Sequence, residues 1–454
     1  MSTRTSRTSV TKLLVLPLAC MLAAMLISAP AGAQPFNPFV VGGAPGVYLD
    51  TDGKIQSRQV DESKELAAMR ARARASQAAA KDAKLAYVSL PKLFAKLRAL
   101  CEAKQDVPDD VRFLGGLTQV RYVFVFPESH DLVIAGPAEP WHVVHELGDP
   151  VGYAVGTRSG RPILQLDDLI VAMRTAEEGG GKLFGCGIYP SPDSLKIADE
   201  IERRMARASR ADRMKALQEE LGPQEVRIFG TANDTRLAFV CVAADYELKR
   251  FAMGIDKSPV PGVGNGVDRS RSAANKYWFE ASYEPLRVAK DGAAYEIRGN
   301  RLLVRAGAFD FDPRGATQKA MTFAEQFTKH MPELAVAVPL FAELQNVADE
   351  SLLANLIRRD RLAERIGWDT AWILDKAACP VEQIPVPRTA QTIVGYTNGS
   401  LVAGGVMLSL GRCVETDARQ TDSTDSLNAA RQPLDALRSD NRGGDGFVWQ
   451  STDH

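Results

Sequence analysis

The chain of 454 residues carries 55 Lys and Arg against 56 Asp and Glu, and 45% of its residues are apolar. These values exclude wholesale disorder, a collagen-like repeat and a multi-span membrane protein, and the length indicates two or three compact units. The near-zero net charge argues against a dedicated nucleic-acid binder, which normally carries a basic excess. None of these values identifies a biochemical activity.

Residues 1–33 have the pattern of a secretory signal peptide. A basic start is followed by an apolar run over 13–27 and by an Ala-Gly-Ala sequence that ends at Ala33. We therefore expect cleavage after Ala33 and export to the periplasm or the cell envelope. The apolar run is shorter than the roughly 20 residues of a spanning helix, so no membrane span is expected in the mature chain. Lipidation at Cys20 and an uncleaved anchor stay open as alternatives.

The next part of the chain is predicted to be a small N-terminal segment followed by a mixed α/β unit. Residues 34–84 should hold a hairpin at Asp52-Gly53 and then an Ala-rich spacer helix. The α/β unit covers 85–261. Its expected elements are a strand pair over 119–135, a hairpin over 141–156, a helix over 166–178, a strand over 183–189, a long helix over 194–221, and strands over 226–229 and 236–243.

A second unit follows a Gly-, Asn- and Ser-rich linker predicted at 262–275. It covers 276–413 and should contain short strands over 276–309, a helical segment over 317–374, and a last strand pair over 392–396 and 402–410. The fold class is thus α+β. Residues 414–454 are polar and acidic, which predicts a disordered tail whose deletion barely changes the melting temperature. Within it, 447–449 is the one place where the tail could dock.

The cysteines allow a disulfide but do not indicate a metal site. Cleavage after Ala33 would leave five of the six cysteines in a compartment that permits disulfides. Cys379 and Cys413 bracket the final strand pair and are the predicted bridge, with Cys186 and Cys241 as the rival pair. No C-x-x-C motif occurs, and no histidine lies near a cysteine, which argues against a zinc site.

Three other motifs resemble functional sites without meeting the requirements of one. His142 and His145 do not stand in the H-E-x-x-H order of a zinc protease, and they fall in a predicted strand entering a turn. The glycines of 179–182 and 262–266 lack the strand and helix context of a phosphate loop, so both are predicted to be flexible connectors. Asp167-Asp168 stands at a helix start, where capping explains it. We therefore expect no metal and no cofactor.

The segment after the predicted strand 236–243 offers the best candidates for ligand contacts. Asp245 and Lys249 are four residues apart, so a helical turn would pair them on one face with Tyr246 beside them. A strand end that carries Asp, Tyr and Lys is a plausible contact position in an α/β unit. The alternative is a surface ion pair beside a half-buried tyrosine.

Several long strings stand in order along the chain, among them GLTQVRYVFVFPE at 116–128 and GRPILQLDDL at 160–169. Shorter strings occur at 131–139, 185–188, 244–246, 323–328 and 404–406. On these strings, the chain from Gly46 to Gly411 resembles an exported bacterial family catalogued as domain of unknown function 1598. That family has no assigned activity, so the resemblance implies no catalytic residue.

Taken together, these observations favour an exported, non-catalytic protein. It would serve as a binding or structural component of the periplasm or cell envelope, with an unidentified partner there and no nucleic acid. The alternative is a hydrolase of cell-envelope material that uses acids such as Asp245 in a cleft between the two units. General acid–base catalysis needs two groups within reach of one bond, which the sequence does not reveal.

Overall fold

The computed structural model describes part of the chain. The described residues are 47–49, 54–57, 84–144, 153–189, 191, 193–268, 274–307, 315–390, 392, 401–415, 419–421, 426–439 and 446–450. The predicted signal peptide with its cleavage site at Ala33 lies outside them, as do His145 and the predicted spacer helix up to residue 83. No helix among the described residues is long and apolar enough to cross a membrane.

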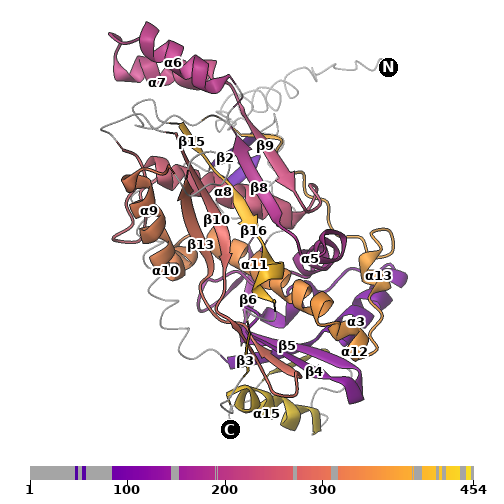
Figure 1. Ribbon diagram of the computed structural model, residues 1–454. Helices are drawn as coiled ribbons and strands as arrows, with labels where there is room; N and C mark the ends of the chain where they lie inside the picture. The colour runs from indigo at the N-terminus through magenta and orange to yellow at the C-terminus, as the bar shows by residue number, and fades with distance from the viewer. Residues whose placement is uncertain are drawn as a thin grey trace, which may run out of the picture. The chain divides into compact units, whose positions relative to one another are not determined.

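Two larger sheets and one separate hairpin contain the strands (Figure 1). The first sheet has the order β1 (Val47–Leu49), β2 (Lys54–Ser57), β14 (Thr389–Ala390), β9 (Gln224–Phe229), β8 (Phe184–Tyr189), β16 (Val406–Leu408), β10 (Ala274–Ser282) and β13 (Arg301–Gly307), and β15 (Leu401–Ala403) also pairs with β10. The second sheet has the order β17 (Arg419–Thr421), β11 (Leu286–Val288), β12 (Ala294–Glu296), β4 (Tyr122–Phe126), β5 (Asp131–Ala138), β3 (Lys84–Ser89) and β18 (Val448–Gln450). The hairpin consists of β6 (Trp141–Val144) and β7 (Tyr153–Gly156).

The helices pack on and between these sheets. In chain order they are α3 (Leu90–Glu102), α4 (Asp109–Arg112), η2 (Leu114–Gly116), η3 (Pro127–Ser129), α5 (Leu166–Gly179), α6 (Ser194–Arg204), α7 (Arg210–Glu220), α8 (Arg236–Met253), α9 (Gln318–Lys329), α10 (Met331–Ala337), α11 (Pro339–Arg359), α12 (Leu362–Arg365), α13 (Ala371–Leu374), α14 (Leu410–Cys413) and α15 (Ser426–Ser439). Helices together with several sheets confirm the predicted α+β class.

Predictions that rest on local patterns agree with the structure. β4 and β5 pair antiparallel across η3, where the strand pair over 119–135 was expected. β6 and β7 form the hairpin predicted over 141–156, with Trp141 opposite Gly156. The helix predicted over 166–178 is α5, and Gly180 ends it with a left-handed φ of 62°, as glycine commonly does after a helix.

Strands from both sides of the predicted linker lie in the same sheets. Val406 of β16 pairs with Cys186 of β8 in the first sheet, and β12 pairs with β4 in the second. The described part of the linker is packed as well, since Val263 and Val267 are buried. The described residues accordingly form one compact unit. The sequence pattern does not contain this information, because strand pairing between distant segments leaves no local signal.

The strand predicted over 236–243 is wrong, because these residues form the first half of α8. Thr235 caps the helix by accepting a hydrogen bond from the amide of Ala238, and Gly254 ends it with a φ of 68°. Almost every residue between the two caps is buried. A short apolar run of this kind fits a buried helix as well as a buried strand, so only the caps distinguish the two structures.

The long helix predicted over 194–221 is two helices, α6 and α7, which pack side by side (Figure 1). Ser209 caps α7 by accepting a hydrogen bond from the amide of Asp212. The two helices bury a small apolar cluster of their own that includes Ile201 and Leu217. Folding back therefore buries apolar surface that one straight helix would leave in water.

The disordered tail predicted over 414–454 is also wrong for the residues that the structure describes. β18 pairs antiparallel with β3, placing Trp449 opposite Tyr87. α15 packs on the second sheet, where Leu434 is fully buried. The few apolar residues of the tail are concentrated on one face of a helix and in one short strand, so a small number of them is enough to dock it.

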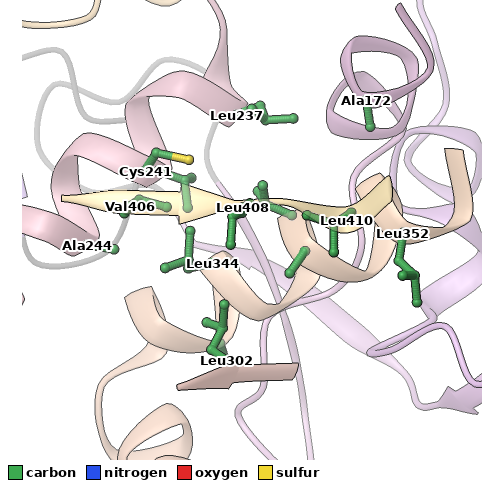
Figure 2. Close-up of a cluster of buried hydrophobic side chains, with 14 of the residues drawn as sticks. Ala172, Leu237, Cys241, Ala244, Leu302, Leu344, Leu352, Val406, Leu408 and Leu410 are labelled. Carbon is green, nitrogen blue, oxygen red and sulfur yellow. The ribbon is translucent and has the colours of Figure 1, made fainter. Parts of the chain in front are cut away.

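The core of the molecule gathers around α11, which is buried from Leu340 to Ile357. α11 contacts α5, α8, α14 and β13. Figure 2 shows buried apolar side chains that these elements contribute to one core cluster, among them Ala172 of α5, Cys241 of α8 and Leu344 of α11. α11 also carries several buried acids, and these acids lead to the candidate site.

Candidate functional site

The predicted contact residues Asp245, Tyr246 and Lys249 lie together in α8, but inside the molecule. Their exposed fractions are 0%, 2% and 4%. Tyr246 faces the guanidinium of Arg250, whose carbon is 6.0 Å from the ring centre. Asp245 and Lys249 are four residues apart in α8, and the charge of each opposes the shift that burial causes in the pKa of the other. A ligand in solution cannot reach them in this arrangement.

Burial has shifted the ionisation of this buried pair strongly. It raises the pKa of Asp245 to about 7, although Lys249 and Lys276 oppose the rise. It lowers the pKa of Lys249 to about 8, while Asp245 opposes that fall. Neither oxygen of Asp245 makes a hydrogen bond of ordinary geometry, although the amides of Ile188 and Gly405 are close enough to favour the charged form. Because a carboxylate buried without good hydrogen bonds is unfavourable, Asp245 holds its proton up to near-neutral pH.

A pocket of about 190 Å³ opens where the first turns of α5 and α8 approach α3. We call it the Arg236 pocket. Its polar lining is Arg112, Gln165, Asp167, Arg236 and Glu382, and the rest is largely leucine, isoleucine, valine and proline. A mostly apolar cavity with a few convergent polar groups is the usual form of a small-molecule site.

The guanidinium of Arg236 anchors one wall of this pocket through a buried network. It donates hydrogen bonds to Asp168 and to Glu343, the latter at 2.6 Å. The side-chain oxygen of Gln165, when turned toward Arg236, accepts from the same guanidinium at 2.9 Å. The amide of Gln165 donates to Glu350 at 3.1 Å. Residues from α5, α8 and α11 are thus held in one arrangement.

This network contains more acid than base. Burial raises the pKa of Glu350 well above its ordinary value, and the charge of Asp168 raises it further. Burial also raises the pKa of Asp168 and of Glu343, although Arg236 opposes both shifts. One oxygen of each of these carboxyl groups has no hydrogen-bond partner in the described part of the chain. Because three buried carboxyl groups around one guanidinium cannot all ionise cheaply, the cluster holds a proton to a higher pH than exposed carboxyl groups would.

Asp167 points toward the pocket while its neighbour Asp168 joins the network. Burial raises the pKa of Asp167, and the Glu382 amide, which donates to it at 3.1 Å, and the charge of Arg112 oppose the rise. Arg112 itself makes no ion pair with any described residue. Cys101 also lines the pocket, but burial raises its pKa, so it stays a thiol rather than a reactive thiolate.

Part of the chain that contributes to this network is recognisable. Residues 186–265 match the family model described as Protein of unknown function (DUF1598). The resemblance predicted from the sequence is confirmed over this range, which includes Arg236 and Asp245; outside the range it stays a prediction. No curated protein and no solved structure matches the chain.

His142 and the cysteines are the remaining residues considered from the sequence. His142 is exposed on β6, and the described residues contain no group of three His, Cys, Asp or Glu side chains placed to hold a metal ion. Cys379 and Cys413 are free thiols in the structure, as are the rival pair Cys186 and Cys241.

Cys379 and Cys413 have separate surroundings in the structure. Arg174 donates a hydrogen bond to the backbone oxygen of Cys379, whereas the thiol of Cys413 turns back toward the oxygen of Ser409 in its own turn, 3.9 Å away. Each cysteine is therefore held by contacts that do not involve the other.

Sequence reasoning missed the Arg236 pocket, because it explained Asp167-Asp168 by helix capping. In the structure the residue at the cap position is Gln165, which makes no side-chain capping bond. Asp168 is instead paired with Arg236, far away in the sequence. The only local signal was an uncommon one, an acidic pair directly before a fully apolar helix segment.

Proposed function

We propose that the protein is a non-catalytic binding protein of the periplasm or cell envelope, whose Arg236 pocket holds a small zwitterionic ligand. The observation that carries the proposal is the lining of the pocket. Two cations, Arg112 and Arg236, and two acids, Asp167 and Glu382, meet an apolar wall in about 190 Å³. That volume equals roughly six water molecules of liquid, so the ligand is about the size of a single amino acid.

The charges of the pocket divide into a group that is already paired and groups available to a ligand. Arg236 is held by its buried acids and acts mainly through its field. Arg112 has no ion pair among the described residues, so its planar guanidinium can donate two hydrogen bonds to a carboxylate. Asp167 has a raised pKa, and an incoming ammonium group would favour its charged form.

The apolar wall supplies the third element of recognition. Leu97, Val107 and Ile170 line the same pocket as the charged groups. A short aliphatic side chain on the ligand would lose contact with water there, and each buried CH₂ group contributes about 0.8 kcal/mol. This argument favours an amino acid such as leucine over glycine. Location in the periplasm or envelope rests on residues 1–33 alone, which have the pattern of a signal peptide.

A hydrolase acting on cell-envelope material is the second candidate. It is favoured by one observation, that Asp167 and Glu382 line the same pocket, because acid–base catalysis needs two such groups near one bond. The acid named from the sequence, Asp245, is fully buried. Cys101 is no substitute nucleophile, since its pKa is raised by burial and by Glu102. The non-catalytic proposal therefore accounts for more of the lining.

Isothermal titration calorimetry of the purified protein with L-leucine tests the proposal. 4-Methylpentanoate is leucine without the ammonium group and isopentylamine is leucine without the carboxylate, so each should bind at least about tenfold more weakly. Arg112→Gln should weaken leucine binding by a similar factor. Arg213→Gln is the matched control, because Arg213 is also half-buried but belongs to α7.

Two outcomes would decide against the proposal. If no amino acid binds, or if Arg112→Gln binds as tightly as the wild type, the pocket does not recognise a zwitterion. If the wild type releases fragments from purified cell-wall material and Asp167→Asn does not, the hydrolase is correct. Binding of leucine without turnover, weakened by Arg112→Gln, supports the binding protein.

A further inference from the structure

A second pocket, of about 450 Å³, lies at the C-terminal ends of α5 and α11 beside α14. Its charged lining consists of Lys182, Arg358, Arg359, Arg412 and Glu415. We call it the basic pocket. It shares no lining residue with the Arg236 pocket, so a ligand bound in the basic pocket would be independent of the proposed function.

Most of the cations in the basic pocket are not used by the protein itself. Lys182, Arg359 and Arg412 make no side-chain hydrogen bond or ion pair with any described residue. Arg358 is the exception, with Nε 3.5 Å from a carboxylate oxygen of Glu177. Three positive groups therefore share one cavity without ion-pair partners among the described residues, which is unfavourable unless solvent or a ligand screens them.

Helix ends attract cations, so this simpler explanation has to be weighed first. The carbonyl groups at the end of α5 are closed by the backbone, since the amides of Gly180 and Gly181 both donate to Ala176. At the end of α11 the amide of Asp360 donates to Leu356. No lysine or arginine of the pocket donates to these carbonyls among the described residues. The end of a helix also attracts a cation only weakly, so two helix ends do not account for four cations in one pocket.

The pocket is also held in shape by close backbone contact. A methyl group added at Gly411 would collide with the backbone oxygen of Gly181, and one added at Gly181 would lie 2.6 Å from the side-chain oxygen of Asn355. A larger residue at 411 would therefore force the backbone to move, and at 181 the φ of 76° strains any residue other than glycine. This contact fixes Lys182, next to Gly181, and Arg412, next to Gly411, on either side of one cavity. The Gly-Gly-Gly-Lys segment is thus a packed turn and not a loose connector.

We infer that the basic pocket binds a ligand through a phosphate group. Phosphate carries nearly two negative charges and presents three strong acceptor oxygens, which matches several unpaired cations better than the single charge of a carboxylate. Arg359 and Arg412 can each donate two hydrogen bonds to it, and Lys182 supplies a point charge. The cavity has the volume of roughly fifteen water molecules, so the ligand is a phosphate ester rather than the bare ion.

The phosphate group can belong to a soluble ester or to a phospholipid headgroup, and one set of variants separates the two. Glycerol 3-phosphate is titrated into the purified protein by calorimetry at low salt. In parallel, the protein is sedimented with vesicles of phosphatidic acid, whose headgroup is a phosphate monoester, mixed with phosphatidylcholine, and with vesicles of phosphatidylcholine alone. The pocket variant is Arg359→Gln with Arg412→Gln. The control variant is Lys196→Gln with Arg203→Gln, which removes two exposed cations from α6.

The pocket variant should lose at least about tenfold in affinity for glycerol 3-phosphate, whereas the control should keep the wild-type value. If only the phosphatidic acid vesicles bind, with the same dependence on the two variants, the phosphate belongs to a lipid. Absence of both kinds of binding overturns the inference, and so does an equal loss in the two variants, which would indicate a general charge effect. All variants should fold, because the substituted side chains are exposed. Their melting temperatures verify this.

Discussion

Docking of the C-terminal segment is the feature of this structure that a single substitution tests most directly. Leu434 of α15 is fully buried in the cluster that the helix forms with the second sheet. Two arginines on the same helix pack on Phe126, with guanidinium carbons 4.5 Å and 3.9 Å from the ring centre. Arg438 also pairs with Asp131 at 2.8 Å. Leu434→Ala would remove the centre of the apolar contact and leave these polar contacts in place.

The size of the effect follows from the burial of that side chain. Replacing a buried leucine by alanine costs about 2–5 kcal/mol, from lost transfer energy and from the cavity that remains. A unit of roughly 400 residues has an unfolding entropy near 0.9 kcal/mol per kelvin at its midpoint. A loss of about 3 kcal/mol would therefore lower the melting temperature by about 3 °C. A tail without structure would show no change.

The assay is thermal unfolding followed by circular dichroism, with Gln432→Ala as the control on an exposed position of the same helix. Gln432→Ala should change the midpoint by less than about 1 °C, because alanine is a good helix former and nothing is uncovered. If Leu434→Ala behaves like this control, α15 does not dock and our account of the tail is refuted. Deletion of 415–454 should destabilise the protein more than Leu434→Ala, contrary to the expectation from sequence.

Three further predictions concern buried groups. Because burial raises the pKa of Asp245 to about 7, the folded state keeps a proton that the unfolded chain loses near pH 4. The contribution of Asp245 to the free energy of unfolding is therefore fully present below pH 4 and is lost as the pH rises through 7. Between pH 5 and 7, the free energy of unfolding measured in urea should fall by about 1 kcal/mol per pH unit more in the wild type than in Asp245→Asn. An equal dependence on pH in the two proteins would contradict the raised pKa. Gly404→Ala would place a methyl group in collision with a carboxylate oxygen of Asp245 and should cost about 3 kcal/mol or more by urea unfolding, whereas Gly179→Ala, with open space around it, should be neutral or slightly stabilising. Finally, iodoacetamide should label half-buried Cys101 in the native protein and Cys186 only after unfolding, and a disulfide found by mass spectrometry of unreduced peptides would contradict the free thiols.

The elements that could be predicted are those whose signal is local. The hairpin of β6 and β7 and the helix α5 each combine an apolar period with a turn or a cap within about fifteen residues, and both were found. The first half of α8 was missed because residues 237–244 are apolar on every face, so no helical stripe appears there. Thr235 and Gly254 at its two ends were the only evidence against a strand.

The candidate site could not be predicted in the same way, because its parts are brought together only by the fold. The Arg236 pocket takes Arg112 from α4, Asp167 from α5 and Glu382 from the segment after α13. Within its own segment, each of these residues looks like an ordinary charged residue of a helix or loop. Only their convergence, together with the buried acids behind them, distinguishes them from other charged residues. The prediction of a disordered tail failed for a related reason. The average composition of the acidic tail does not reveal that its apolar residues lie on one face of a helix.

α11 shows how the fold fixes both pockets at once. A helix that is buried on all sides has no preferred face by hydrophobicity, so its rotation must be set by specific polar pairs. Glu343 accepts from Arg236 of α8 at 2.6 Å, and Asp349 accepts from Arg301 of β13 at 3.2 Å. Rotation of the helix would break both pairs and leave buried charges without partners, which is strongly unfavourable. The same pairs that orient Glu343 beside the Arg236 pocket therefore also determine where Arg358, at the end of the helix, meets the basic pocket.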